Sequence, residues 1–248
     1  MKLIILSAGK GERLWPLTRD KPKSLVEVAP GVTLLDMQIS RARSRGIREI
    51  VVMVGYRAEC IEAHLKDCDP PVRTEFNPFF DVSNNLITAW LARHEMNSEF
   101  VLLNGDVIFH AAVLDALLAA SSPPEIHMVV DRKPSYDEDD MKVVIDGDRV
   151  LDVGKGLLPQ VTNGESIGMI RFSAAGAARF AWTLDQMVRD PSNRDVFYLA
   201  ALQRLMQDTH VGWVECQPVD WAEVDFHPDV TFVTSNLKRF DERIARWK

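Results

Sequence analysis

A glycine-rich segment follows the first hydrophobic run of the sequence. Glycine lets the backbone approach an anion closely, and successive backbone N–H groups can then hold phosphate oxygens. Arg13 and Lys23 lie downstream and would bring positive charge to the same oxygens. The residues expected around a bound nucleotide here are Leu6, Ala8, Gly9, Lys10 and Gly11. The glycines alone are equally typical of an ordinary turn, because the segment matches neither G-x-x-x-x-G-K-S/T nor G-x-G-x-x-G.

Two other segments place carboxylates where a divalent cation could bind. Asp106 follows the hydrophobic run 100–103 and a short polar turn, near the carboxyl end of an expected strand. Mg²⁺ is typically bound by one or two protein carboxylates together with phosphate oxygens and water. Glu223 and Asp225 are two residues apart, so a strand would project both to one face. The alternatives are a helix cap at Asp106 and a solvent-facing acidic edge at residues 223–225.

Amides and a lysine add further candidate contacts. Asn84 and Asn85 suit either hydrogen bonds to the edge of a base or a helix N-cap. Gly105, directly before Asp106, is expected beside the nucleotide. Lys155 stands between two glycines after an expected strand, where it could reach the phosphate of an acceptor. The alternative for Lys155 is an ordinary surface lysine.

The elements that would position these residues alternate through the first half of the chain. Strands are expected at residues 2–6, 49–54, 72–76, 100–103 and 126–130, and helices at 34–45, 59–66, 85–94 and 113–120. This alternation predicts an α/β fold with a mostly parallel sheet that helices cover on both faces. Ligands of such sheets collect at the carboxyl ends of the strands.

The second half of the sequence has a different pattern. Asp146-Gly147-Asp148 predicts a hairpin between residues 141–145 and 149–153. The remaining expected elements are strands at 166–172, 211–216 and 221–224 and helices at 174–188, 195–207 and 230–247. The acidic run 137–140 favours a solvated loop. We therefore expect one domain over residues 1–248, with a small antiparallel insertion.

Composition narrows the class of partner. A net charge of −7 and a pI near 5.4 argue against nucleic-acid binding, which needs a cationic surface. The three cysteines are widely spaced and favour reduced thiols in a cytoplasmic protein. The apolar start is too short for a signal peptide, and no run of about 18 apolar residues predicts a membrane span. The oligomeric state is not readable, and a homodimer stays open.

The longer string around the glycines carries a resemblance. Residues 7–25 read SAGKGERLWPLTRDKPKSL, which resembles the A-G-x-G-x-R-L-x-P-L-T-x-x-x-P-K-x-L signature of the sugar-phosphate nucleotidyltransferase superfamily. The resemblance implies a single Rossmann-like domain, Mg²⁺, and attack of a metabolite's phosphate on the α-phosphorus of a nucleoside triphosphate. It also implies that Arg13 and Lys23 hold the triphosphate. Asp106 and Asp225 would be metal ligands, with Glu223 nearby.

Two further stretches resemble the bacterial phosphocholine cytidylyltransferase-like branch. The run from Trp221 to Asp225 is similar to its W-x-E-I-D segment, and residues 77–90 are similar to its N-x-x-Y/F-x-x-x-N-N-x-x-S-x-W stretch. The resemblance assigns Lys155 and the segment around Glu165 to the acceptor, and Trp221 and Glu223 to the same pocket. Asn104 stands where many relatives have an acid. The run 196–199 lacks the acid of the branch's aromatic-Glu pair.

These observations lead to ranked hypotheses. The first is a Mg²⁺-dependent cytidylyltransferase that joins CTP to a small phosphorylated alcohol or phosphonate, with phosphocholine as the type acceptor. Aromatic faces such as those of Trp90, Tyr136, Tyr198 and Trp221 could bind a quaternary ammonium. The second is a pyrophosphorylase that uses UTP, dTTP or GTP with a sugar-1-phosphate. The third is a nucleotide-binding regulator without turnover. The identity of the acceptor stays open.

Overall fold

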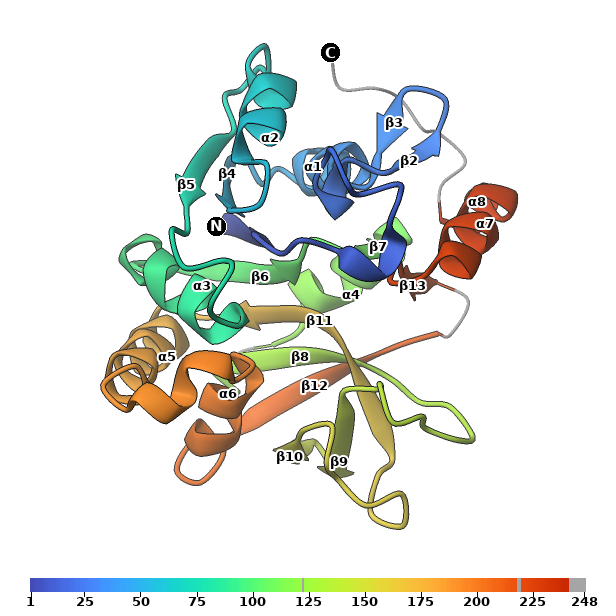
Figure 1. Cartoon of the computed structure of the whole chain (residues 1–248). Coiled ribbons are helices and arrows are strands. Elements are labelled where there is room, and N and C mark those ends of the chain that lie inside the picture. Colours follow the sequence, from blue (N-terminus) through green and yellow to red (C-terminus); the bar gives the residue numbers. More distant parts are fainter. Residues whose placement is uncertain (122, 218–219, 241–248) are drawn as a thin grey trace.

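A nine-stranded sheet forms the centre of the molecule, seen in a computed structural model that describes residues 1–121, 123–217 and 220–240. β1 (Lys2–Ser7) lies in the middle, between the parallel strands β4 (Glu49–Val54) and β6 (Phe100–Asn104). β5 (Arg73–Phe76) extends the parallel part beyond β4 (Figure 1). The mostly parallel sheet predicted from the alternating pattern is confirmed.

The other half of the sheet contains antiparallel pairs. β11 (Gly164–Phe172) runs antiparallel to β6, and β8 (Ile126–Asp131) runs antiparallel to β11. β12 (Val211–Cys216) pairs with β8 in parallel. The predicted hairpin of β9 (Lys142–Asp146) and β10 (Arg149–Val153) is confirmed. It pairs with the start of β11, a contact that the sequence did not predict.

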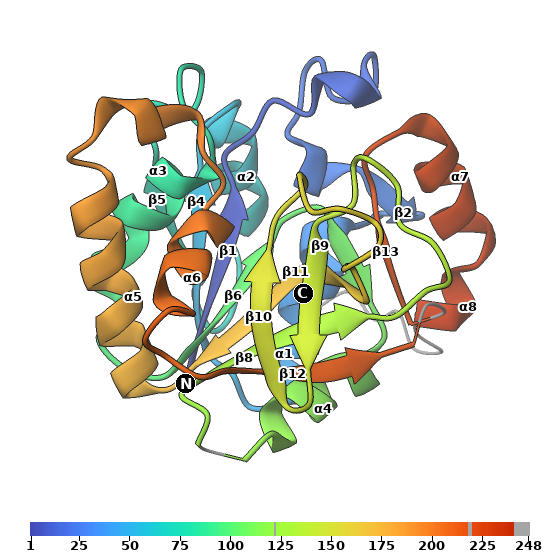
Figure 2. The same cartoon turned by 90° about the horizontal axis from the view of Figure 1, so that it is seen from below.

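Helices cover both faces of the sheet, and the central strand shows why. Leu3 and Ile5 of β1 share a hydrophobic core with one set of helices, and Ile4 and Leu6 share another core with the opposite set. The first set is α1 (Leu34–Ser44), α2 (Ala58–Leu65) and α4 (Ala111–Ala119); the second is α3 (Asn85–Leu91), α5 (Ala174–Met187) and α6 (Leu199–Leu205). A strand covered on both faces is expected to be apolar between its ends, and β1 is apolar from Leu3 to Leu6, with the polar Lys2 and Ser7 at its two ends. Figure 2 shows α3, α5 and α6 together on one side of the sheet.

A third, smaller core lies beside the sheet and was not predicted. Leu14 of the glycine-rich loop packs there with Ile108 and Val224. The elements around it are β2 (Glu27–Ala29), β3 (Val32–Thr33), β7 (Val107–Phe109), β13 (Trp221–Glu223), α7 (His227–Ser235) and α8 (Leu237–Phe240). This core therefore ties the glycine-rich loop to the acidic segment near the end of the chain.

Some predicted boundaries were wrong. The helix expected at 195–207 begins only at Leu199, because Asn84 N and Leu86 N donate to the carbonyls of Arg194 and Val196 and hold that segment against α3. The helix expected at 230–247 is interrupted at Asn236, and residues 241–248 lie outside the described part. The helix expected at 85–94 ends at Leu91 and continues as a 3-10 turn. Among the described residues, no helix is long and apolar enough to cross a membrane.

Candidate active site

The glycine-rich loop leaves β1 at the carboxyl end of the sheet and folds back on itself. Gly11 has a φ of 62°, in the left-handed region that favours glycine, and its carbonyl accepts a hydrogen bond of 2.7 Å from Thr18 Oγ1. A Cβ at Gly9 would point into open space, so packing within the protein does not explain this glycine. The loop thus has a defined shape and presents an open backbone surface.

Lys23 lies where the loop returns to the sheet, and it faces two carboxylates. Its Nζ is 2.9 Å from Asp106 Oδ2 and also pairs with Asp225 Oδ1. Burial alone would lower the pKa of Lys23, but the charges of Asp106 and Asp225 outweigh it and raise the pKa above its ordinary value. Arg13 NH1 lies 3.1 Å from Asp225 Oδ2. The two cations assigned to the triphosphate therefore sit against the two predicted metal ligands.

Strand pairing brings together carboxylates that are far apart in the sequence. β7 and β13 are antiparallel with Val107 opposite Glu223, and Val224 N donates to Asp106 O at 3.0 Å. As a result, one oxygen each from Asp106, Glu223 and Asp225 lie within 4.8 Å of one another. Desolvation beside its neighbours, followed by the charges of Asp106 and Asp225, raises the pKa of Glu223 above its ordinary value, although the residue is exposed at the mouth of the site.

This group of three carboxylates fits a divalent cation. Oxygen is the ligand type that Mg²⁺ prefers, and close carboxylates repel one another unless a cation neutralises them. Asp106 Oδ1 is buried and has no hydrogen-bond partner among the described residues, so this oxygen is available to bind a cation.

A cavity beside the loop is the candidate nucleotide site. Its lining comprises Leu6, Ala8, Gly9, Phe80, Ser83, Asn84, Asn85, Thr88, Asn104 and Asp106. Asn84 Oδ1 accepts from Asn85 N and caps α3. Of the two roles expected for Asn84, this oxygen therefore has that of a helix N-cap. Asn85 Oδ1 accepts from Tyr198 N at 2.8 Å. Phe80 and Ser83 belong to the stretch that resembles cytidylyltransferases, yet the sequence alone assigned them no role.

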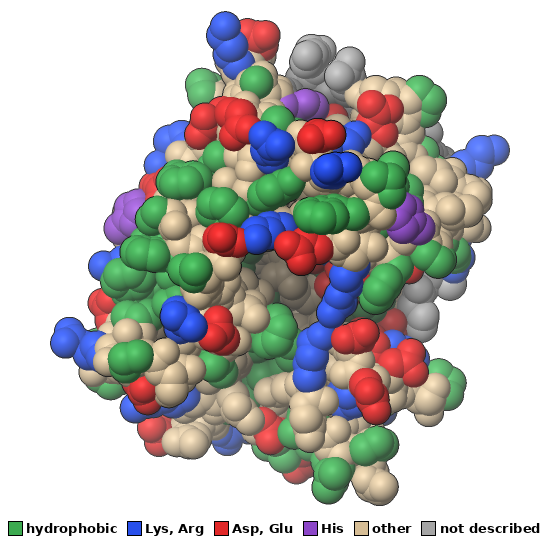
Figure 3. Space-filling model, viewed as in Figure 1, with side chains coloured by type: hydrophobic (Ala, Val, Ile, Leu, Met, Phe, Trp, Pro, Cys, Tyr) green, Lys and Arg blue, Asp and Glu red, His purple; other side chains and the backbone are tan. Residues whose placement is uncertain are grey.

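Lys10 and Gly105 line two further openings beside the glycine-rich loop. Lys10 pairs with Asp81 and, at 3.7 Å, with Glu12, and it lines an opening that also contains Arg13 and Lys23. Gly105 N donates to Leu6 O at 2.9 Å, and Gly105 lines a small cavity together with Gly9 and Lys23. Figure 3 shows this face of the molecule hollowed near its middle, with acidic and basic side chains around the hollow.

A second cavity adjoins the first and is the candidate acceptor site. Its lining comprises Arg13, Asn85, Asn104, Asp106, Asp139, Met141, Lys155, Glu165, Ser166, Ile167, Gly168, Phe197, Tyr198, Leu199, Glu223 and Asp225. Lys155 Nζ is 3.4 Å from Asp139 Oδ1 and 5.5 Å from the centroid of the Phe197 ring. Arg13 NH2 is 3.8 Å from the same Asp139 oxygen. The acidic run predicted to be a solvated loop thus supplies one residue to the cavity.

Glu165 and Trp221, both expected at the acceptor, have different positions. Glu165 is buried in the wall of the cavity, 2.7 Å from Lys133 Nζ. Burial raises the pKa of Glu165 to about 7, against the opposing effect of Lys133. Trp221 is absent from the lining of this cavity; its indole N–H donates to Asp131 Oδ2 at 2.9 Å and its ring packs on a hydrophobic core. The structure therefore does not support the expected contact of Trp221 with the acceptor.

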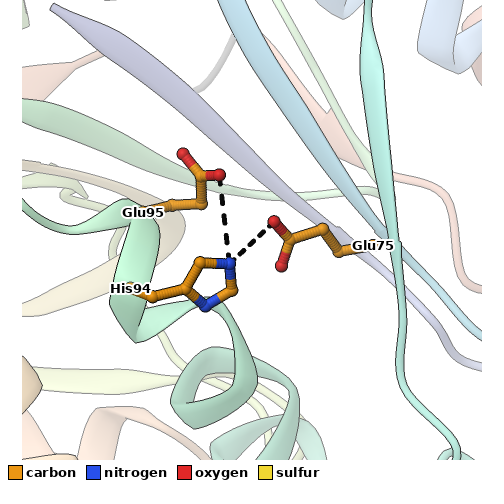
Figure 4. A group of neighbouring side chains, drawn as sticks. All are labelled: Glu75, His94 and Glu95. Carbon is orange, nitrogen blue, oxygen red and sulfur yellow. Dashed lines mark hydrogen bonds and ion pairs between the residues drawn. The ribbon is translucent and has the colours of Figure 1, made fainter.

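A second group of possible metal ligands lies elsewhere, at Glu75, His94 and Glu95. His94 Nε2 is 2.9 Å from Glu75 and 3.9 Å from Glu95 (Figure 4). Glu95 also pairs with Lys2 and Arg73, and hydrogen bonding from Arg73 lowers the pKa of Glu95 to about 2. Unlike the group at Asp106, this group has no buried carboxylate oxygen without a hydrogen-bond partner among the described residues, so we interpret it as an ion-pair network that ties β1 to β5.

Comparison with known proteins places the chain among nucleotide-using transferases. The family described as Nucleotidyl transferase matches residues 2–145. The chain is 26% identical to the CTP:phosphoglutamine cytidylyltransferase of Campylobacter jejuni, over 93% of this chain and 98% of that protein. It is 36% identical to the choline-phosphate cytidylyltransferase of Streptococcus pneumoniae, over 44% and 46%. It is 30% identical to the N-acetylmuramate alpha-1-phosphate uridylyltransferase of Neisseria meningitidis, over 72% and 75%.

A solved structure supports the fold. The inositol-1-phosphate CTP transferase from T. maritima superimposes with a TM-score of 0.81 at 21% identity, covering 98% of this chain and 97% of that chain. The family match includes the glycine-rich loop, Lys23 and Asp106. The chain therefore belongs to the Nucleotidyl transferase family and is an enzyme of the nucleotidyltransferase type.

Proposed function

We propose that this enzyme transfers a cytidylyl group from CTP to a phosphate or phosphonate oxygen of a small acceptor, of which phosphocholine is the type. The observation that carries the proposal is the junction of the two cavities. Asn85, Asn104 and Asp106 line both of them, and the carboxylates Glu223 and Asp225 border the second. An α-phosphate at this junction would face an acceptor oxygen in the neighbouring cavity.

The reaction needs no nucleophile from the protein. An oxygen of the acceptor's phosphate attacks the α-phosphorus, the bond to the β-phosphate oxygen breaks, and pyrophosphate leaves. Catalysis of such transfers is mostly positioning and electrostatic stabilisation. Arg13 and Lys23 would stabilise the negative charge of the leaving pyrophosphate, and Lys155 would hold the acceptor's phosphate. Mg²⁺, when bound by Asp106 and Asp225 beside Glu223, would neutralise charge on the phosphate oxygens.

The relatives, more than the site, support CTP as the donor. Two of the three relatives above transfer cytidylyl groups and one transfers a uridylyl group. The wall of the nucleotide cavity contains the amides of Asn84, Asn85 and Asn104, which could bind the edge of a base. The Oδ1 atoms of Asn84 and Asn85 already accept from backbone N–H groups, whereas Asn104 Oδ1 has no partner among the described residues. Amides can pair with the edge of any base, so the choice of cytosine rests on the cytidylyltransferase relatives.

A two-step turnover screen tests the proposal. Pyrophosphate release is first measured with CTP, UTP, GTP and dTTP in the presence of Mg²⁺. The preferred triphosphate is then combined with phosphocholine, phosphoethanolamine, phosphoglycerol, inositol phosphate and aminoethylphosphonate. We expect CTP with one of these acceptors to give the fastest release.

Two other outcomes would replace the proposal. Preference for UTP or dTTP with a hexose-1-phosphate would identify an NDP-sugar pyrophosphorylase. Tight CTP binding without Mg²⁺-dependent turnover on any acceptor would identify a nucleotide-binding regulator, although the clustered Arg13, Lys23, Asp106 and Asp225 argue against that function.

A further inference from the structure

The hydroxyl of Tyr198 has an unusual position for a tyrosine. The side chain is fully buried, and its Oη has no hydrogen-bond partner among the described residues. Buried polar groups of proteins are nearly always hydrogen-bonded, and leaving one without a partner costs free energy. A buried hydroxyl of this kind needs an explanation, and the wall of the acceptor cavity to which Tyr198 belongs suggests one.

Packing holds the phenol ring in place. The backbone N–H of Tyr198 donates to Asn85 Oδ1 at 2.8 Å, so the residue is tied to the start of α3. Its ring meets the edge of Phe180 at a centroid distance of 6.5 Å and belongs to the main hydrophobic core. The ring cannot turn the hydroxyl toward solvent without leaving this core.

The surroundings of the hydroxyl define what it could bind. Burial, and then the charges of Asp106 and Glu223, raise the pKa of Tyr198, so the phenol stays protonated and can donate. These are the carboxylates at the junction with the nucleotide cavity, where the acceptor's phosphate must lie to reach the α-phosphorus. Tyr198 lines the same cavity as Asp106 and Glu223, so its donor belongs to the wall that would receive the acceptor's anion.

We propose that Tyr198 is an acceptor-binding residue whose hydroxyl donates a hydrogen bond to the phosphate or phosphonate group of the acceptor. The inference rests on the proposed function and extends it, because it assigns a neutral donor to a place otherwise dominated by carboxylates. A neutral donor can bind a phosphate oxygen without competing with Mg²⁺ for those carboxylates.

Kinetics of Tyr198→Phe give the first test. The substitution removes only the hydroxyl. We expect KM for the best acceptor of the turnover screen to rise roughly 3- to 10-fold, the effect of one neutral hydrogen bond, with KM for CTP nearly unchanged. Tyr136→Phe is the matched control, because Tyr136 Oη accepts from Lys133 N and Tyr136 is absent from the cavity lining. An unchanged acceptor KM in Tyr198→Phe would overturn the inference.

Stability separates binding from a structural role. If the hydroxyl has no partner in the free protein, Tyr198→Phe should leave the Tm unchanged or raise it. A Tm that falls by several degrees, together with an equal rise of both KM values, would show that the hydroxyl supports the fold, and it would overturn the assignment.

Fluorine NMR gives a test that does not depend on turnover. The chain has three tyrosines, so protein labelled with 3-fluorotyrosine should show three signals, and Tyr198→Phe identifies the one from Tyr198. With CTP bound, titration with inorganic phosphate should shift this signal and leave those of Tyr56 and Tyr136 in place. A stationary Tyr198 signal would overturn the inference, even if the enzyme turns over. Lack of turnover with every triphosphate would instead defeat the proposed function, and the phosphate titration would still decide the role of Tyr198.

Discussion

The triphosphate side and the acceptor side of the cleft are built differently. On the triphosphate side, Lys10, Arg13 and Lys23 come from one continuous loop that leaves β1. On the acceptor side, several short segments each add a few residues, from the start of α3 to Asp225 just after β13. A contiguous loop suits the triphosphate, a group that all nucleotide donors share. A cavity built from many segments can be altered by substitutions in one segment while the others stay the same, which suits an acceptor that varies.

The charges differ as well. The opening around the loop is lined by three cations and three carboxylates, while the acceptor cavity is lined by five carboxylates and two cations, Arg13 and Lys155. Lys23 and Arg13 are shared, because both pair with Asp225 at the boundary. The contrast predicts that substitutions at this boundary affect the whole reaction, and that substitutions farther into the acceptor cavity affect acceptor binding or stability alone.

The largest effect is expected for Asp106→Ala, because Asp106 lines both cavities and belongs to the carboxylate group. Pyrophosphate release should fall at least ~10²-fold, as for the loss of one preorganised electrostatic group. The matched control is Asp115→Ala on α4, which removes only a surface pair with Arg45. Near-normal turnover of the Asp106 variant would remove this residue from the mechanism.

Lys23→Ala should lower turnover by ~10²-fold for the same electrostatic reason, and it should also change how the neighbouring carboxylates bind a metal ion. Without the ammonium group between Asp106 and Asp225, the carboxylates should bind Mn²⁺ more tightly in the absence of nucleotide. Calorimetric titration with Mn²⁺ measures this second effect, with Lys21→Ala as the control. Weaker Mn²⁺ binding would contradict the assignment of these carboxylates to a metal.

The free energy of unfolding should depend on pH through Glu165, a buried carboxyl in the wall of the acceptor cavity. Glu165 has a pKa of about 7 in the folded protein, against 4.5 ordinarily, so the folded state binds the proton more tightly. The contribution of Glu165 is therefore favourable at low pH and is lost as the pH rises from about 4.5 through 7. Relative to Glu165→Gln, the wild type should lose on the order of 3 kcal/mol of unfolding free energy across that window.

Urea unfolding at a series of pH values measures this loss. Lys133 and Asp140 are the charged groups that face Glu165, and both are retained in the variant. Glu62→Gln, on the exposed side of α2, serves as the control substitution. If the Glu165→Gln and wild-type curves ran parallel across the whole range, burial would not be controlling this carboxyl.

Of these four substitutions, Lys155→Ala should have the smallest effect and the most selective one. Lys155 borders only the acceptor cavity and is partly exposed, so its loss should raise KM for the acceptor about tenfold and leave KM for CTP unchanged. Lys66→Ala, at the exposed end of α2, is the control. An equal rise of both KM values would show that the two sides of the cleft are not separable.

Much of the fold was predictable, because its signals are local. The apolar run of β1 and the alternation of strands and helices depend on neighbouring residues, and the predicted parallel strands all appear in the sheet. Errors arose where distant contacts control the backbone. α6 begins late because α3 holds the segment before it, and Leu14 packs into a core that Val224 completes from the other end of the chain.

The sequence by itself determined the glycine-rich loop, its two cations and the carboxylates, since each lies in a contiguous pattern with its own chemistry. Only the tertiary structure decided which charges meet. It paired Lys23 with Asp106 and Asp225, and it brought Asp139 from an apparent solvent loop to Arg13 and Lys155. It also turned Trp221 toward Asp131 and buried the hydroxyl of Tyr198 beside the acceptor cavity. These outcomes depend on strand register and core packing across the whole chain, which no short pattern contains.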